Sequence, residues 1–126
     1  MEIDDITYRI RAAVFEVNKV LGAGFLEKVY EKALLIELER QGLKAKAQVP
    51  LAVYFKGAIV GEYLADIVVE DVVILELKAA DRLDKMFTAQ ILNYLKASGF
   101  RIGMLINFRY PKADIKRFIM DTPEGR

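Results

Sequence analysis

The sequence predicts a single α/β (α+β) domain over residues 1–126, with a mixed β-sheet flanked by helices. Two segments with a helical spacing of apolar residues open the chain, and three strand-like segments follow them. A further helical segment then precedes a fourth strand and a short last one. Three successive strands can pair as an antiparallel meander, and a helical crossover can return the next strand parallel to them. The sheet should therefore contain both kinds of pairing.

The first helix is predicted by apolar residues at steps of three and four, which form one stripe on a helix. This stripe consists of Ile3, Ile6, Ile10, Val14, Val17 and Leu21. Gly22 and Gly24 should end the helix and turn the chain. A second helix is expected at about 26–41, with Gly42 as its stop. Its apolar stripe consists of Val29 or Tyr30, Leu34 and Leu38.

The centre of the predicted sheet is the segment 61–80, which reads as two strands joined by a tight turn at Glu70–Asp71. Both strands are dense in Val, Ile and Leu, which is typical of strands buried on two faces. Before them, residues 44–55 alternate around Pro50, which indicates an edge strand or a bulge. Lys56–Gly57 should form the turn between this strand and the next.

The last part of the chain predicts a crossover helix and two strands. Asp84 is expected to cap a helix over 84–97. Residues 100–108 should form a buried strand, and residues 114–120 a short final strand. We expect the tail, 122–126, to be frayed.

Composition narrows the class of protein. Hydrophobic residues make up 54% of the chain and charged residues 29%, which suits a compact globular domain rather than a disordered chain. There is no run of about 18 apolar residues, so we expect no membrane span and no membrane partner. The opening stretch, MEIDDITYR, lacks the basic-then-apolar order of a signal peptide, and there is no cysteine for a disulfide. We therefore expect a cytoplasmic protein.

Composition also narrows the kind of site. The chain contains neither histidine nor cysteine, so any metal ion must be held by oxygen. The net charge of +1 provides no overall attraction to nucleic acid. Such a near-neutral domain leaves room for a protein partner or a homo-oligomer.

Three charged residues interrupt the apolar segment 61–80: Asp66, Glu76 and Lys78. Burying an uncompensated carboxylate costs several kcal/mol, so these positions call for an explanation. A buried salt bridge is one alternative, but two acids and one base leave an excess negative charge. Two carboxylates on one sheet face, with an ammonium beside them, instead suit a hard divalent cation and a charged assistant.

This interpretation depends on strand register. Side chains alternate along a strand, so a two-residue loop at Glu70–Asp71 would pair Asp66 with Leu75 and turn Glu76 to the other face. We therefore predict a three-residue loop through Val72, or a bulge, that places Asp66 opposite Glu76.

The pattern Asp66 … Glu76-x-Lys78 resembles the signature of the PD-(D/E)xK nuclease superfamily. Two further motifs support the resemblance. Gly24-Phe-Leu-Glu27-Lys-Val-Tyr30 is similar to the G-x-x-E-x-x-Y motif that gives a family of small bacterial proteins its name, the GxxExxY family. Gln90-Ile-Leu-Asn-Tyr94 resembles the Q-x-x-x-Y motif of RecB-like exonucleases.

The segments QVP at 48–50 and LINF at 105–108 also resemble the GxxExxY family, and the resemblance extends over about 3–119. It implies a restriction-endonuclease-like core. It also implies a nuclease that hydrolyses phosphodiester bonds with Mg²⁺ or Mn²⁺, acting on DNA ahead of RNA.

Roles for individual residues follow from this chemistry. As metal ligands we expect Asp66, Glu76, the Leu77 carbonyl and Glu27, the last directly or through water. As catalytic residues we expect these three carboxylates together with Lys78, which would assist the attacking water or the phosphate charge, and Gln90. We expect Tyr94 and Tyr30 to contact the residues that hold the metal rather than the metal itself.

Simpler interpretations remain open at several positions. Glu27 can favour a helix N-terminus, Gln90 can be a solvated polar residue, and Tyr30 is better explained by core packing. Scattered basic residues can steer a phosphate backbone or simply be solvated. These are Arg101, Arg109, Lys112, Lys116 and Arg117.

Two other functions compete with the nuclease hypothesis. One is a catalytically weak or inactive nuclease fold that binds nucleic acid or a protein. The other is a structural protein with an internal ion-pair cluster.

Overall fold

The computed structural model describes residues 1–82, 84–109 and 111–120. Within these ranges the chain forms α1 (Ile3–Leu21), α2 (Glu27–Arg40), β1 (Ala45–Phe55), β2 (Ala58–Val69), β3 (Val73–Lys78), α3 (Lys85–Ser98), β4 (Ile102–Asn107) and β5 (Asp114–Ile119). The predicted succession of helices and strands is confirmed. The tail that we expected to be frayed, 122–126, lies outside the described residues.

The helices begin and end close to the predicted residues. Gly22, with φ 73°, follows the last residue of α1 and donates its backbone N–H to the Asn18 carbonyl. In α2 the apolar stripe contains Tyr30 rather than Val29, because Tyr30 is fully buried and Val29 is 39% exposed. The side chain of Asp84 accepts the Met86 N–H at 2.9 Å and so caps α3 as predicted.

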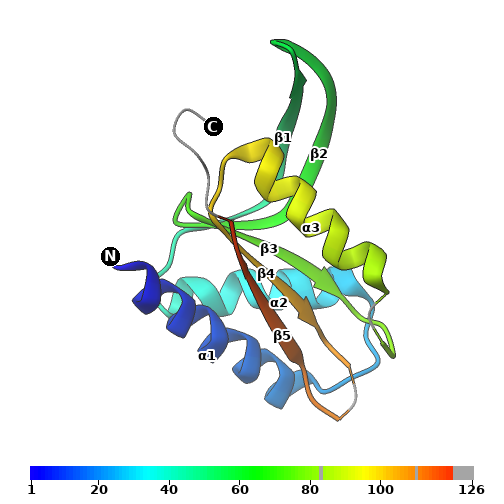
Figure 1. Ribbon diagram of the computed structural model, residues 1–126. Helices are drawn as coiled ribbons and strands as arrows, with labels where there is room; N and C mark the ends of the chain where they lie inside the picture. The colour runs from blue at the N-terminus through cyan, green and yellow to red at the C-terminus, as the bar shows by residue number, and fades with distance from the viewer. Residues whose placement is uncertain (83, 110, 121–126) are drawn as a thin grey trace.

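The five strands form one mixed sheet in the order β1-β2-β3-β4-β5. β3 and β4 are parallel and are joined through α3, whereas the other neighbours are antiparallel (Figure 1). Buried residues of α1 and α2 form one core with one face of the sheet, and Tyr94 and Leu95 of α3 form a second core with the other face. The predicted mixed sheet flanked by helices is thus confirmed.

The loop between β2 and β3 has the predicted three residues. Val69 pairs with Val73, and Ile67 pairs with Leu75. The turn itself is tight, because Val72 donates its N–H to the Val69 carbonyl at 3.0 Å, and Val72 is the extra residue that shifts the pairing by one. Continued by one step, this register places Asp66 opposite Glu76.

The prediction that both central strands are buried on two faces is wrong for the first half of β2. Residues 58–64 are all exposed, and only the second half of β2 lies in the core. The physical reason is strand length: β1 and β2 have 11 and 12 residues, whereas β3 has only 6. The outer ends of β1 and β2 therefore project beyond the other strands as a hairpin, here called the arm and defined as residues 52–64 (Figure 1).

No helix in the described part of the chain is long and apolar enough to cross a membrane.

Candidate functional site

The site is built where β2 separates from β3. Backbone pairing between the two strands ends at Ile67 with Leu75. Beyond this pair, side-chain carboxylates accept the backbone N–H groups. The Asp66 N–H donates to Glu76 Oε1 at 3.3 Å, and the Leu77 N–H donates to Asp66 Oδ2 at 2.7 Å. Each carboxylate therefore occupies a place that a backbone carbonyl holds in a regular ladder. This exchange brings Asp66 and Glu76 together, as the sequence predicts.

Burial changes the protonation of both acids. Glu76 is only 5% exposed. Burial, followed by the neighbouring charge of Asp66, raises the pKa of Glu76 to about 8. Burial also raises the pKa of Asp66, against the opposing effect of the Leu77 N–H bond. The pair is therefore held in a form that resists carrying two negative charges.

Lys78 lies beside this pair without forming an ion pair with it in the described residues. Its Nζ stands 4.5 Å from the centroid of the Phe87 ring on α3, where a cation–π contact is favourable. The Lys78 charge lowers the pKa of both acids, but burial outweighs it. This arrangement is not the closed internal salt bridge of the structural alternative.

A pocket of about 250 Å³ opens beside Asp66 toward α2. It is lined by Glu27, Lys28, Glu31, Gln48, Asp66 and Leu77. Glu27 is exposed in the first turn of α2. It lines the same pocket as Asp66 and Leu77.

Sequence reasoning missed three residues of this pocket, Lys28, Glu31 and Gln48. Glu31 is 8% exposed and accepts a hydrogen bond from Gln48 Nε2 at 2.8 Å. The Lys28 Nζ lies 3.6 Å from the other Glu31 oxygen. The available signal was helical spacing, because Glu31 follows Glu27 by four residues and shares its helix face. Gln48 belongs to the QVP segment and has an unusual positive φ of 54° within β1.

Tyr94 of α3 covers the Glu76 side of the pair. It is 6% exposed, and burial, with smaller contributions from the charges of Glu76 and Asp66, raises its pKa to about 12. Gln90 lies one turn earlier on the same helix and is half-buried. Within the described residues no hydrogen bond joins Gln90 or Tyr94 to either carboxylate. Tyr94 lies close enough to the pair for their charges to affect its pKa.

Tyr30 is placed for packing. Its hydroxyl donates to the Gly22 carbonyl at 2.6 Å and accepts the Phe25 N–H at 3.3 Å. Its ring stacks on Phe108, with centroids 4.3 Å apart and planes inclined by 3°. The core interpretation is confirmed, because Tyr30 is fully buried, and its hydroxyl bonds the loop between α1 and α2 rather than a carboxylate.

The chain matches a family model and several solved structures. A family model described as the PD-(D/E)XK nuclease superfamily matches residues 4–118. A comparison with curated proteins finds no match. Among solved structures, SSO0001 has 14% sequence identity and a TM-score of 0.61 over 77% of this chain. The chain spans about half, 51%, of the length of SSO0001.

An alkaline exonuclease (LHK-Exo) from Laribacter hongkongensis also matches, with a TM-score of 0.45 and 10% identity. The match covers 95% of this chain and 83% of the exonuclease. At 14% identity the likeness to SSO0001 shows the fold alone. The mixed sheet with its three helices is consistent with a restriction-endonuclease-like core. Because the family model matches nearly the whole sequence, the chain belongs to the PD-(D/E)XK nuclease superfamily.

Proposed function

We propose that this protein is a divalent-metal-dependent nuclease that hydrolyses phosphodiester bonds in DNA or RNA, within the GxxExxY group of its superfamily. The observation that carries the proposal is the pairing of half-buried Asp66 with buried Glu76. Both acids have a raised pKa, and no adjacent cation neutralises them by an ion pair in the described residues. A fold that only needed stability would gain by an apolar pair here, so the pair is better explained by a ligand of opposite charge.

The donor set fits a hard divalent cation. Asp66, Glu76, the Leu77 carbonyl and Glu27 all offer oxygen, which Mg²⁺ and Mn²⁺ prefer. In the part of the chain that the structure describes, no group of three acidic side chains by itself forms a metal cage. Backbone oxygen and water would therefore complete the shell, as is usual for Mg²⁺. Such an ion would supply Lewis-acid stabilisation of charge on the phosphate.

Lys78 supports the same chemistry from the protein side. It alternates with Leu77 on β3 and so points from the same strand face as Glu76. Its ammonium, held over Phe87, would stabilise negative charge that develops on the phosphate oxygens. Glu31 joins the proposal as a residue that would orient Gln48 and Lys28 around the pocket.

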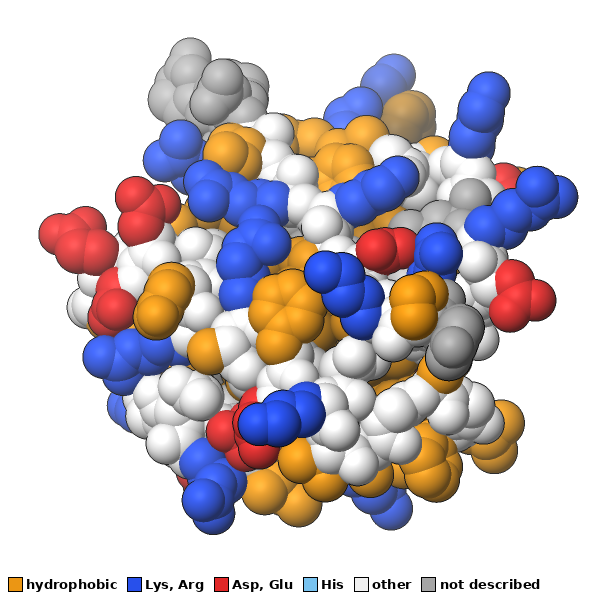
Figure 2. All heavy atoms as spheres, turned by 90° about the horizontal axis from the view of Figure 1, so that it is seen from below, with side chains coloured by type: hydrophobic (Ala, Val, Ile, Leu, Met, Phe, Trp, Pro, Cys, Tyr) orange, Lys and Arg blue, Asp and Glu red, His pale blue; other side chains and the backbone are white. Residues whose placement is uncertain are grey.

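The surface also suits a polyanion. On the face shown in Figure 2, Lys and Arg side chains are spread among exposed apolar ones. Of the basic residues singled out from the sequence, Arg101, Lys112, Lys116 and Arg117 are exposed. Arg109 pairs with Asp114 at 3.0 Å, so part of its charge is already used within the protein.

The decisive experiment measures cleavage of labelled DNA and RNA with Mn²⁺. Replacing Lys78 by Ala removes a cation that binds no metal, so cleavage should slow by about 10²–10³-fold, the scale for losing one preorganised charge-stabilising group. Metal binding and nucleic-acid binding should change far less, because other contacts set them. Lys19→Ala, which removes an exposed lysine of α1, is the matched control and should cleave as the unaltered protein does.

A second candidate is a nuclease fold that binds nucleic acid or a protein without cutting, favoured by the lack of a three-acid group in the described residues. Binding without cleavage in the unaltered protein would establish it. Equal cleavage by the unaltered protein and Lys78→Ala would contradict the proposed nuclease role of this site.

A further inference from the structure

Gln48 has a backbone conformation that a residue within a strand rarely adopts. Its φ is 54°, in the left-handed region, although it belongs to β1. The other described non-glycine residues with positive φ are Lys56, Glu70 and Asp71, which all lie in the turns of hairpins. Glutamine is not among the residues that adopt this conformation readily, so it costs free energy at this position. Strain of this kind gathers at functional sites, where the surrounding structure enforces it.

The strained residue stands opposite Asp66. The neighbouring backbone pairs of β1 with β2 are Ala47 with Ile67 and Val49 with Ala65. Because the register is the same on both sides, Gln48 is the residue of β1 that lies across from Asp66. The positive φ of Gln48 is therefore not the mark of an inserted residue.

Both strands change faces at this place. Side chains at every second position of a regular strand share one face. In β1, Ala45 packs with the core of α1 and α2, whereas Val49 and Leu51 pack with the core of α3. In β2, Ile67 packs with the first of these cores and Ala65 with the second. The alternation therefore reverses in both strands, where the strained residue and the acid opposite it lie.

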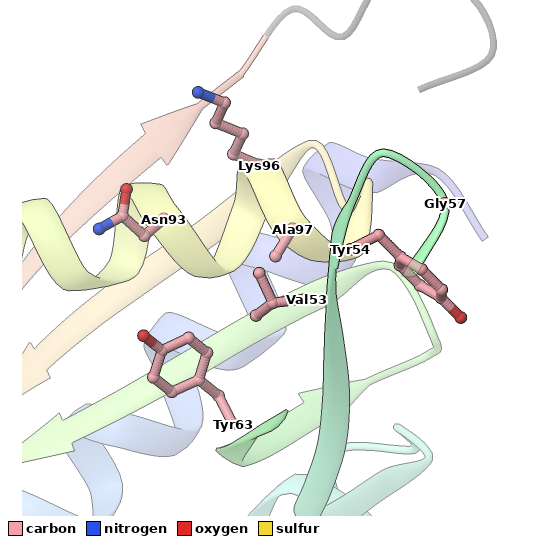
Figure 3. Close-up of a pocket in the computed structure, with 7 residues that line it drawn as sticks. All are labelled: Val53, Tyr54, Gly57, Tyr63, Asn93, Lys96 and Ala97. Carbon is pink, nitrogen blue, oxygen red and sulfur yellow. The ribbon is translucent and has the colours of Figure 1, made fainter. Parts of the chain in front are cut away.

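The arm continues the reversed alternation. Figure 3 shows Val53 of β1 pointing toward Ala97 of α3 across a groove of about 620 Å³. Tyr63 of β2 contacts Tyr94 of α3, with ring centroids 4.8 Å apart. Gln48 is thus the point at which β1 passes from the α2 side of the sheet to the α3 side.

The positive φ lets the Gln48 side chain reach α2. In a regular strand this side chain would lie on the face opposite that of Ala45, which packs beside α1 and α2. Instead, Gln48 Nε2 donates to Glu31 Oε1 at 2.8 Å. A carboxylate only accepts hydrogen bonds, so the amide nitrogen must be the end that faces Glu31.

This hydrogen bond is the contact that fixes the Glu31 carboxylate. Glu31 is buried, and its other oxygen lies 3.6 Å from the Lys28 Nζ. The Lys28 side chain is 68% exposed, and an ion pair with so exposed a lysine holds its partner weakly. Gln48, which is half-buried and comes from another element, restricts Glu31 more strongly.

Glu31 is held beside the proposed cation site. It lines the pocket of about 250 Å³ together with Gln48, Asp66 and Leu77. Burial is the main cause of the raised pKa of Asp66, and the nearby charge of Glu31 adds to it. A divalent cation at Asp66 would feel the same negative charge. Mg²⁺ and Mn²⁺ keep bound waters, and a carboxylate at this place can accept their hydrogen bonds.

We infer that Gln48 is a positioning residue for the cation site, which holds the Glu31 carboxylate beside Asp66 as an acceptor for the waters of a bound divalent ion. The inference rests on the proposed function, because it takes the ion to bind at Asp66 and Glu76. It also explains the strain in β1, since an extended residue at this position would not reach α2.

The test measures Mn²⁺ binding by isothermal titration calorimetry without nucleic acid. Gln48→Met keeps the length of the side chain and removes the hydrogen bond. Gln48→Gly also removes the backbone strain, because glycine adopts positive φ freely. Each should weaken Mn²⁺ binding by about 10-fold, the lower end of the range for losing an outer-shell partner. In metal-free thermal melts Gln48→Gly should be at least as stable as the unaltered protein, so unfolding cannot explain its loss.

Gln41→Met is the matched control. Gln41 also donates to a glutamate of α2, Glu37 Oε2 at 3.3 Å, but neither residue lines the pocket. Its replacement should leave Mn²⁺ binding unchanged. A double-mutant cycle shows whether Gln48 acts through Glu31. The variant that combines Glu31→Ala with Gln48→Met should bind Mn²⁺ no more weakly than Glu31→Ala alone.

Three outcomes would overturn the inference. They are unchanged Mn²⁺ binding in both Gln48 variants, an equal loss in Gln41→Met, and effects of Gln48→Met and Glu31→Ala that add in the double variant.

Asp66→Asn separates this inference from the proposed function. If Asp66→Asn abolishes Mn²⁺ binding while the Gln48 variants bind as the unaltered protein does, the ion binds at the pair and only the role of Gln48 is wrong. If the unaltered protein binds no Mn²⁺, or Asp66→Asn binds it equally well, the proposed function fails and the positioning role fails with it.

Discussion

At the scale of single residues, Asp66 and Glu76 form a site at a cost to the fold. Each accepts a backbone N–H from the other strand, and no cation forms an ion pair with them in the described residues. Burial raises the pKa of both, and for Glu76 it reaches about 8, so the folded protein favours a proton on Glu76 at neutral pH. This cost is the expected property of a site that waits for a charged ligand.

Removing the Glu76 charge should stabilise the protein at pH values above the ordinary pKa of a carboxyl group. Between pH 4.5, the ordinary pKa of a glutamate, and the folded-state pKa of about 8, the folded state keeps the Glu76 proton that the unfolded state has released. The free energy of unfolding therefore falls as pH rises through that window and levels off above it. We expect Glu76→Gln at pH 8, with a chelator present, to have a higher free energy of unfolding than the unaltered protein, by on the order of 2 kcal/mol. Urea denaturation measures this difference.

Near pH 4 both side chains at this position are neutral, so the difference should shrink. Glu16→Gln, at an exposed position of α1, serves as the matched control and should show no such pH-dependent gain. A gain from Glu76→Gln of the same size at pH 4 and pH 8 would show that Glu76 is not held protonated.

At the scale of elements, the β2–β3 loop decides whether the site exists. Glu70 and Asp71 both adopt positive φ, at 54° and 57°, which gives the tight turn the twist that hairpins require. Glu70 is anchored, because its carboxylate accepts the Lys44 N–H at 2.7 Å. Val72 then adds the one residue that sets Glu76, rather than Leu75, opposite Asp66.

Asp71 is the position where this turn can be improved. A side chain at positive φ is strained, whereas glycine adopts that conformation without penalty. The only ion pair of Asp71 among the described residues is an exposed contact with Lys46 at 4.0 Å, which contributes little. Asp71→Gly should therefore raise the free energy of unfolding by about 0.5–1 kcal/mol, and Asp71→Ala should lower it.

Chemical denaturation of both variants measures this pair of effects. The changes in the free energy of unfolding should have opposite signs in the two variants. Because both variants remove the same carboxylate, this difference reports the effect of the backbone conformation at residue 71. If the two variants shift stability in the same direction, the positive φ at residue 71 does not limit the stability of the loop.

At the scale of the whole molecule, the carboxylate pair lies near the middle of the sheet order, and ligand binding there should be felt by the entire fold. α2 borders it through Glu27 and Glu31, and α3 borders it through Phe87 and Tyr94. An ion that binds only the folded site stabilises all of these elements together.

Mn²⁺ or Mg²⁺ should accordingly raise the melting temperature. At a hundredfold excess over the dissociation constant, the gain is about 2.7 kcal/mol in the free energy of unfolding. The shift should be larger at pH 8 than at pH 6, because below a pKa of about 8 the ion must displace the proton of Glu76. Thermal melts at both pH values measure it. Asp66→Asn should abolish the shift, and an equal shift in that variant would place the ions elsewhere.

The features that could be predicted from the sequence are those set by residues close to one another in the chain. The helix bounds, the capping of α3 by Asp84 and the turn at Glu70–Asp71 depend on neighbours a few residues away, and these predictions are confirmed. The pairing of Asp66 with Glu76 was also predictable, because side chains alternate along a strand and only an even offset brings both acids to one face.

Contacts between segments that are distant in the chain could not be predicted from the sequence. Nothing local shows that the first half of β2 projects from the core, because its Ile59, Val60 and Leu64 look like core residues. Glu31 and Gln48 meet only when α2 packs beside β1, and Tyr63 meets Tyr94 only when α3 crosses the sheet.

The sequence by itself determined the order of helices and strands, the mixed sheet, the superfamily signature and the acidic pair at its centre. Tertiary structure alone decided that β2 extends beyond β3. It also decided that Lys78 contacts Phe87 rather than the acids, and that the Tyr30 hydroxyl bonds the loop after α1. The physical reason is that periodicity and turn chemistry act over a few residues. Burial, which sets both the pKa of Glu76 and the exposure of the arm, depends on every element that packs around a position.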